Sequence, residues 1–372
     1  MRLKGIPLGS VPRLLAPRRV AFDAPLQVFI AVCDHYEPLW ERPARHVQDA
    51  RVQRWVRGYP ESVGGIVDSA GRSPQHTFFY PGDEYDPEHV DQIAGLCRQG
   101  HGDVEVHLHH RDDTSQSLRE KLEDYVETLH NRHGLLERDR SGRITYGFIH
   151  GNWALDNSGP HGAWCGVNDE LTILRETGCY ADFTMPAAPD PCQTTTVNSI
   201  YYAIDDPHKP KSHDKGIPAR VGQAPPQNSL LMIQGPLGFD WSSRKWGILP
   251  RLENGDLTGA RPPSLARLRL WCRAAVHVAG RPDWLFVKLH THGAQEQNME
   301  MLLGGPMRQL HRDLREVNLQ NPTFRYHYVT AREMAALVHQ AEERHSGAPE
   351  MGLRPADEGA GGGNGRPALT AG

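Results

Sequence analysis

The stretch DVEVHLHHRDDTSQSLREKLEDYVETLHNRHG, residues 103–134, contains a strand pattern that is followed directly by a helix pattern. Residues 103–109 alternate apolar and polar side chains, as a strand with two different faces does. Residues 117–133 carry apolar side chains at helical spacing, and Gly134 is a typical residue just past a helix end. The same order of strand and helix recurs along the chain, which predicts an α/β fold with a parallel sheet.

The remaining predicted elements extend this alternation over most of the chain. Further strands are predicted for residues 26–33, 76–81, 144–150, 180–185, 230–235, 284–290 and 325–330. Helices are predicted for residues 45–59, 86–99, 168–178 and 331–344, and Asp86 followed by Pro87 is a typical helix start. So many units favour a deformed (β/α) barrel of the glycoside hydrolase and deacetylase type over an open sheet. Residues 186–252 are rich in Pro, Asn and Ser and are expected to form a loop-rich excursion above the barrel.

The composition bounds the domain organisation and the class of protein. We expect one barrel domain over residues 26–345 of the 372-residue chain, preceded by an N-terminal arm of residues 1–25. Residues 346–372 contain the run GAGGGNG and are predicted to be a disordered tail rich in Gly and Pro. The formal charge of −4 gives no reason to expect a nucleic-acid partner. The sequence shows neither a transmembrane segment nor a signal peptide, so we expect a cytoplasmic protein, while the oligomeric state stays open.

The cysteines are distributed in an ordinary way, whereas the number of histidines is unusual. The six cysteines include no C-x-x-C pair, and we expect reduced, mostly buried thiols. Histidine is unusually frequent, with 21 residues. Seven histidines lie on helical stretches and are expected at the surface: His46, His89, His130, His133, His311, His339 and His345.

Other polar side chains gather where the predicted strands end, which is where α/β barrels place their chemistry. These residues are Asp34, His35, Glu37, His107, His109, His110, Asp112, Asp113, His150, Asn152, Trp153, Asp182, His290 and His292. Because alternate residues share one face of a strand, Glu105, His107 and His109 are expected to face the barrel axis. Two histidines spaced in this way can offer both imidazoles to one metal ion.

Residues 76–110, HTFFYPGDEY followed by DPEHVDQIAGLCRQGHGDVEVHLHH, resemble the polysaccharide deacetylase (NodB-homology) superfamily, which includes carbohydrate esterase family four. They are similar to the T-F-F strand of that family and to its G-H-E-I-x-N-H-x-x-x-H segment. VCDHYEP (residues 32–38) and FVKLHTHG (residues 286–293) are similar to its first-strand T-F-D-D and its late L-x-H motif. The resemblance covers about two-thirds of the chain, with residues 186–252 unmatched.

The resemblance implies a set of metal ligands. It places His109 on the first metal histidine of the family and Asp113 on the second. Since Asp113 replaces a histidine there, His107 or His110 is available for the vacant place.

The resemblance also implies catalytic roles. At the first strand, either Asp34 is the base and His35 a ligand, or Asp34 is the ligand and Glu37 the base. His290 matches the catalytic acid histidine of the family. The R-x-P-Y motif of the family is not visible, and GFIHGNW (residues 147–153) occupies that region.

The sequence therefore predicts a metal-dependent hydrolase, with zinc as the divalent ion, that deacetylates N-acetyl sugars in a polysaccharide or its precursor. The expected substrate-binding residues are His150, Asn152, Trp153 and His292, and Trp153 is either a sugar platform or a core residue. One alternative is a metal-independent glycoside hydrolase that pairs Asp34 or Glu37 with Asp182. A metal-dependent phosphoesterase and a non-catalytic, glycan-binding barrel are the other two.

Overall fold

The structure is a computed structural model that describes residues 2–3, 6–15, 25–343 and 348–351. The strands of its main sheet are β3 (Leu26–His35), β4 (His76–Pro81), β5 (Gly102–Leu108), β6 (Glu137–Arg138), β7 (Ile144–His150), β8 (Cys179–Asp182), β9 (Ile200–Ile204), β10 (Ile217–Pro218), β11 (Ser229–Ile233), β14 (Asp256–Leu257), β15 (Trp284–Thr291) and β16 (Phe324–Tyr328). The helices are α1 (Val11–Leu15), α2 (Arg45–Val63), α3 (Pro87–Leu96), α4 (Ser115–His133), α5 (Glu170–Thr177), α6 (Leu265–Ala274), α7 (Glu296–Leu303), α8 (Gly305–Gln320) and α9 (Ala331–Glu342).

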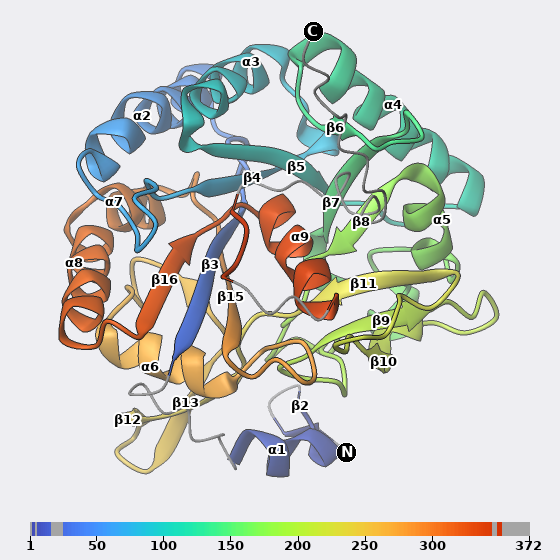
Figure 1. The fold of residues 1–372 in the computed structure, drawn as a ribbon. Helices are drawn as coiled ribbons and strands as arrows, with labels where there is room; N and C mark the ends of the chain where they lie inside the picture. The colour runs from blue at the N-terminus through green and yellow to red at the C-terminus, as the bar shows by residue number, and fades with distance from the viewer. Residues whose placement is uncertain (1, 4–5, 16–24, 344–347, 352–372) are drawn as a thin grey trace, which may run out of the picture.

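The main sheet has twelve strands, and its path runs β10-β9-β11-β8-β7-β5-β4-β3-β15-β14 (Figure 1). β6 pairs with β7 and β16 with β3, away from this path. From β11 to β14 along the path each neighbouring pair is parallel, whereas β9 and β10 add antiparallel edges. The predicted α/β class with a mostly parallel sheet is confirmed. A closed barrel is not confirmed, because no hydrogen bonds join β10 to β14 within the residues that the structure describes.

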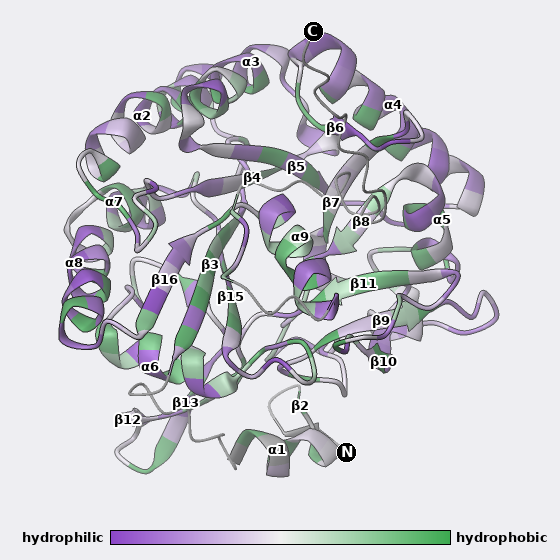
Figure 2. Cartoon of the chain, in the orientation of Figure 1, coloured by the Kyte–Doolittle hydropathy of each residue, from purple (hydrophilic) through white to green (hydrophobic). Residues whose placement is uncertain are grey.

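The side chains of β3 show how the sequence builds two cores around the sheet. One face of β3 carries Leu26, Val28, Ile30 and Val32, which pack against the outer helices. Phe29, Ala31 and Cys33 alternate with them and lie in a second core. Figure 2 shows hydrophobic residues along β3 and hydrophilic ones on the outer helices α4 and α8. The two-residue period of a strand therefore determines which side chains reach the inside of the curved sheet.

Helix α9 lies within the curve of the sheet (Figure 1). Thr330 caps its first turn, and the helix is buried on nearly all sides. Arg332 Nη2 lies 3.1 Å from Glu105 Oε1, and Arg332 Nη1 donates to Thr145 Oγ1 at 3.0 Å. These contacts join α9 to β5 and β7, away from the carboxyl ends of the strands, where the polar residues lie.

Parts of the chain differ from the expected organisation. Residues 186–252 do not form only an excursion, because β9, β10 and β11 continue the main sheet, where Leu230 and Leu231 are buried. The hairpin of β12 (Gly238–Lys245) and β13 (Leu249–Glu253) forms a separate sheet. In the expected arm, β1 (Arg2–Leu3) pairs with β2 (Ile6–Pro7). Most of the expected tail lies outside the described residues.

Three of the helical histidines expected at the surface are buried, so that expectation is wrong for them. His89 Nε2 lies 2.8 Å from Asp49, His133 Nδ1 lies 2.7 Å from Asp91, and His311 Nδ1 lies 2.6 Å from the Tyr328 hydroxyl. A polar partner for each ring offsets the free-energy cost of burying it. His46 is exposed, and His345 lies outside the described residues.

The cysteines behave as expected. All six are free thiols, and five of them are buried. Separately, none of the helices in the described ranges combines the length and the apolar character needed to cross a membrane.

Candidate functional site

Five side chains converge beyond the carboxyl ends of β3, β5 and β15: His35, Glu37, His107, His109 and His292, here named the Glu37 group. Neighbouring parallel strands end at the same edge of the sheet, which brings residues that are far apart in the chain together. The nitrogen and oxygen atoms of two triads, His35–Glu37–His292 and Glu37–His107–His109, lie within 4.8 Å of one another in each triad. The expectation that His107 and His109 share the inner face is consistent with this arrangement.

Glu37 is the centre of the group. Its Oε1 lies 3.3 Å from His107 Nε2 and 3.1 Å from His109 Nε2. His107 Nδ1 lies 2.8 Å from the carbonyl oxygen of Ile149. Because a carbonyl only accepts, Nδ1 carries a proton, and a neutral His107 therefore directs its Nε2 lone pair at the Glu37 carboxylate. A cation between these two atoms would relieve the repulsion.

The pKa values of Glu37, His35 and His107 favour the charge states that metal ligands need. Burial disfavours the charged form of Glu37, but the surrounding histidines, His107 and His109 first among them, outweigh burial and hold the pKa of Glu37 well below the usual range. Burial, followed by the proximity of His292 and His107, holds the pKa of His35 well below 6.5. Burial also lowers the pKa of His107. His35 and His107 are therefore neutral beside an ionised Glu37, whereas Asp83 and Glu37 outweigh burial and raise the pKa of His109 to about 10, so a bound ion would displace a proton from His109.

The donor set of the Glu37 group fits a divalent metal ion. Glu37 Oε2 is buried and has no hydrogen-bond partner among the described residues. Such an orphaned carboxylate oxygen is costly unless a cation or a water molecule satisfies it. Imidazole nitrogens with one carboxylate oxygen are ligands that zinc accepts.

The Glu37 group is open to solvent on one side. His35 and Glu37 are buried, whereas 27% of the His109 side chain is exposed and His292 is half-buried. The rings of Trp40 and Trp153 lie 6.1 and 6.4 Å from the His292 ring, measured between centroids. Open access with an aromatic border suits a site that meets a substrate.

Asp34 is not brought into the Glu37 group. It lies on the helix-facing side of β3, where its carboxylate accepts from the Gly293 N–H at 2.5 Å and lies 2.9 Å from His76 Nε2. Asp34 is an even number of residues from Val28 and Ile30, so its side chain leaves β3 on the same face as theirs. The His35 side chain leaves the strand on the opposite face. Both roles that the sequence suggested for Asp34 depend on the opposite orientation.

Other expected residues lie around the group or away from it. The His290 ring lies 6.4 Å from the His35 ring, between centroids, and His290 Nδ1 has no hydrogen-bond partner in the described part of the chain. Asp113 lies 2.6 Å from Lys121 Nζ and is therefore a partner of another cation. Asp182 accepts from Thr184.

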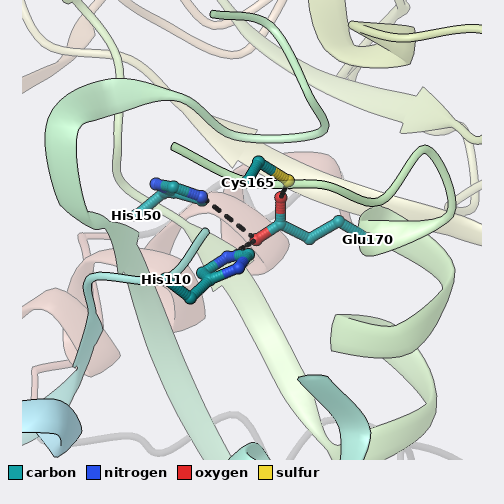
Figure 3. Close-up of side chains that lie close together, drawn as sticks. All are labelled: His110, His150, Cys165 and Glu170. Atoms are coloured by element: carbon teal, nitrogen blue, oxygen red, sulfur yellow. Dashed lines mark hydrogen bonds and ion pairs between the residues drawn. The ribbon is translucent and has the colours of Figure 1, made fainter. Parts of the chain in front are cut away.

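A second cluster, here named the Glu170 group, contains His110, His150, Cys165 and Glu170 (Figure 3). Glu170 Oε1 lies 3.1 Å from His110 Nε2 and 3.7 Å from His150 Nε2, and the Cys165 thiol lies 3.3 Å from Glu170 Oε2. All four residues are buried. His150 is therefore closed to solvent, although the sequence predicted it as a substrate-binding residue. Such a group could hold a metal ion.

Sequence reasoning missed three residues. Cys165 and Glu170 lie in and after a loop, at no spacing that marks them as partners of His110 or His150. Glu84 ends the short 3-10 helix after β4. Burial, followed by the charges of Glu37 and Asp83, raises the pKa of Glu84 to about 7. The segment PGDEY carries no sequence signal for this role, because Glu84 comes near Glu37 and His109 only through the fold.

Comparison with known proteins leaves the family unassigned. No protein-family model matches the chain, and no curated protein matches it. The chain is similar to a solved structure described as a "putative polysaccharide deacetylase from Mycobacterium smegmatis", with 14% identity and a TM-score of 0.44 over 91% of this chain and 98% of that chain. This similarity assigns neither a family nor an activity.

Proposed function

We propose that the chain is a metal-dependent hydrolase whose divalent ion is held by the Glu37 group. The observation that carries the proposal is the position of Glu37 Oε1, 3.3 Å from His107 Nε2 and 3.1 Å from His109 Nε2. With His107 Nδ1 bound to a carbonyl, the lone pair of a neutral Nε2 points at an anion, and a cation resolves that conflict. Zinc is the ion that this ligand set favours.

When bound, such an ion supplies Lewis-acid chemistry, because it polarises a carbonyl group and lowers the pKa of a water molecule. His35 and His292 would complete the ligand set with Glu37. Glu84, whose pKa is raised to about 7, would exchange protons at its carboxyl oxygens near neutral pH. Glu84 is therefore a better candidate for proton transfer than the strongly acidic Glu37.

We propose an N-acetylated sugar in a polysaccharide or its precursor as the substrate, bound at the mouth of a deformed and incomplete barrel. Residues 76–110 support this choice through their resemblance to polysaccharide deacetylases. Trp40 and Trp153 support it through their place beside His292, since aromatic rings are suitable platforms for sugars. Asn152, which is exposed next to Trp153, would contact the same ligand.

One observation favours a second candidate, a metal-independent glycoside hydrolase. Glu37 is held ionised while the pKa of the nearby Glu84 is raised, and retaining and inverting glycosidases need such a divided pair of carboxyl groups. This pair replaces the one with Asp182 that the sequence suggested.

The two candidates differ in their response to metal removal. The full chain is purified, its metal content is measured by elemental analysis, and N-acetylhexosamine oligomers are assayed for released acetate and for cleaved glycosidic bonds. We expect acetate release that a strong chelator abolishes and that zinc restores. Sugar cleavage that survives the chelator would select the glycosidase.

Variants locate the activity within the Glu37 group. Glu37→Gln is expected to lose the ion, whereas Glu84→Gln is expected to keep it and to lower kcat by about a hundredfold or more. Glu41→Gln, at an exposed position in the loop after β3, is the matched control and should change neither property. Full metal content together with full activity in Glu37→Gln would refute the proposal.

A further inference from the structure

We infer that the Glu170 group is a second metal site, a closed zinc site with a structural role that fastens residues 150–170 beside the Glu37 group. Its four side chains come from separate elements: His110 follows β5, His150 ends β7, Cys165 lies in the following loop, and Glu170 begins α5. The close-up in Figure 3 shows all four directed toward one point.

The spacing of the donor atoms fits tetrahedral zinc. Metal–ligand distances of about 2.0–2.3 Å place neighbouring donors roughly 3.3–3.7 Å apart in a tetrahedron. Two separations from one Glu170 oxygen, Oε1, are close to this range: 3.1 Å to His110 Nε2 and 3.7 Å to His150 Nε2. Cys165 Sγ lies 3.3 Å from the other oxygen, Oε2. All four donor atoms lie within 4.8 Å of one another. Two imidazoles, one thiolate and one carboxylate form a ligand set typical of zinc.

The second nitrogen of each histidine lies beside an oxygen atom, as is usual for a histidine that binds a metal. His150 Nδ1 is hydrogen-bonded to the carbonyl oxygen of Gly151, and His110 Nδ1 lies 3.1 Å from Asp113 Oδ2. Asp113 is in turn bound by Lys121. Histidine ligands are commonly fixed by a carbonyl or a carboxylate on the nitrogen that does not bind the metal. Both Nε2 atoms face the Glu170 carboxylate.

The orphaned nitrogen of His150 is the second, independent observation. The His150 side chain is fully buried, and its Nε2 has no hydrogen-bond partner among the described residues. Because Nδ1 donates its proton in a hydrogen bond to the Gly151 carbonyl, Nε2 of the neutral ring carries a lone pair, and this lone pair faces the Glu170 carboxylate. A purely hydrogen-bonded network leaves this contact repulsive, whereas a cation satisfies both atoms.

The two groups differ in solvent exposure, which indicates different roles for their metal ions. The four side chains are closed to solvent, with His110 the most accessible at 5% exposure. Structural zinc sites are closed in this way, whereas catalytic sites keep an open position. The loop between His150 and Glu170 carries Trp153, which borders the Glu37 group. An ion here would hold that loop against β5 and β7.

Cobalt substitution tests this inference independently of the proposed function. The Glu170 group includes a thiol and the Glu37 group has none, so a thiolate-to-cobalt charge-transfer band reports only on the second site. We expect the band in the cobalt-loaded full chain and in His109→Ala, which removes a ligand of the other group. Cys165→Ser should lose the band and one equivalent of metal per chain. Cys272→Ser, at another buried free cysteine, is the matched control and should keep both.

X-ray absorption keeps the inference testable if Cys165→Ser does not fold. In zinc-loaded His109→Ala, the spectrum is expected to contain a sulfur scatterer at about 2.3 Å. A coordination shell of only nitrogen and oxygen, or the absence of a charge-transfer band in the cobalt-loaded wild-type chain, would overturn the inference. Either result would leave the Glu37 group as a separate question, to be answered by its own variants.

Discussion

Asp34 and His35 are consecutive residues of β3 whose side chains leave opposite faces of the strand. The Asp34 carboxylate accepts from the Gly293 N–H on the helix side, whereas the His35 ring lies 4.9 Å from the His107 ring on the inner side, between centroids. Since the strand is extended through both positions, neither side chain can replace the other without a change of register. The two residues should therefore respond differently to substitution.

Asp34→Ala is expected to destabilise the protein and to leave metal binding intact. The substitution removes the buried acceptor of the Gly293 N–H and of His76, which should cost about 1–3 kcal/mol of unfolding free energy. His35→Ala should lower zinc affinity at least about tenfold. Urea denaturation and zinc titration measure the two effects. Loss of zinc in Asp34→Ala at wild-type stability would contradict this division.

Glu37→Gln is expected to lower the pKa of His109 in metal-free protein. Burial lowers this pKa, but Asp83 and Glu37 outweigh it and raise the value from 6.5 to about 10. A pKa raised in the folded state stabilises the protein below pH 6.5, and this contribution is lost as the pH rises through about 10. As the pH rises from 6.5 to about 10, the unfolding free energy of Glu37→Gln should therefore fall less than that of the wild type. NMR titration of the His109 ring and denaturation at several pH values check this, and an unchanged His109 titration would contradict it.

The elements of the fold could be predicted from local sequence, and the candidate site only in part. Alternation predicted β5, and the helix start at Asp86 and Pro87 predicted α3, because these signals act within a few residues. Alternation also paired His107 with His109, but both faces of β3 are apolar, so it could not show which of Asp34 and His35 points inward. Whether the sheet closes is decided by long-range strand pairing, which leaves no local signal.

The Glu170 group shows more clearly which contacts local sequence patterns cannot predict. His110 and Glu170 are 60 residues apart and meet only because β5 lies beside β7 and α5 begins next to that edge. A spacing rule that depends on one helix or one hairpin cannot find such a pair. Partners of this kind become visible only when the strand order is known.

Trp153→Ala is expected to weaken substrate binding more than catalysis. The Trp153 ring lies 6.3 Å from the His35 ring and 6.4 Å from the His292 ring, between centroids, so it can contact a sugar without taking part in the chemistry. Loss of a stacking ring should raise KM several-fold, by roughly 0.5–1.5 kcal/mol, with kcat nearly unchanged. Trp246→Ala, in the loop between β12 and β13, is the matched control. Equal effects of the two substitutions on KM would remove Trp153 from the site.

Glu105→Gln is expected to change how stability depends on pH. Burial raises the pKa of Glu105 from 4.5 to about 7, although Arg332 and hydrogen bonds from Gly147 and Tyr180 oppose this shift. Between these two values the folded state holds a proton that the unfolded state has released. Folding then binds protons, so the wild type loses stability as the pH rises from 4.5 to about 7.

Glutamine does not titrate, so this loss should be absent from Glu105→Gln. The unfolding free energy of the variant should therefore improve relative to the wild type across this window and stay constant relative to it at higher pH. Urea denaturation of both proteins at a series of pH values gives the difference directly. Glu333→Gln, at the half-buried N-terminal turn of α9, is the control for a carboxyl group that is lost near the same helix. A difference between wild type and Glu105→Gln that does not change with pH would show that Glu105 is ionised throughout, held so by Arg332.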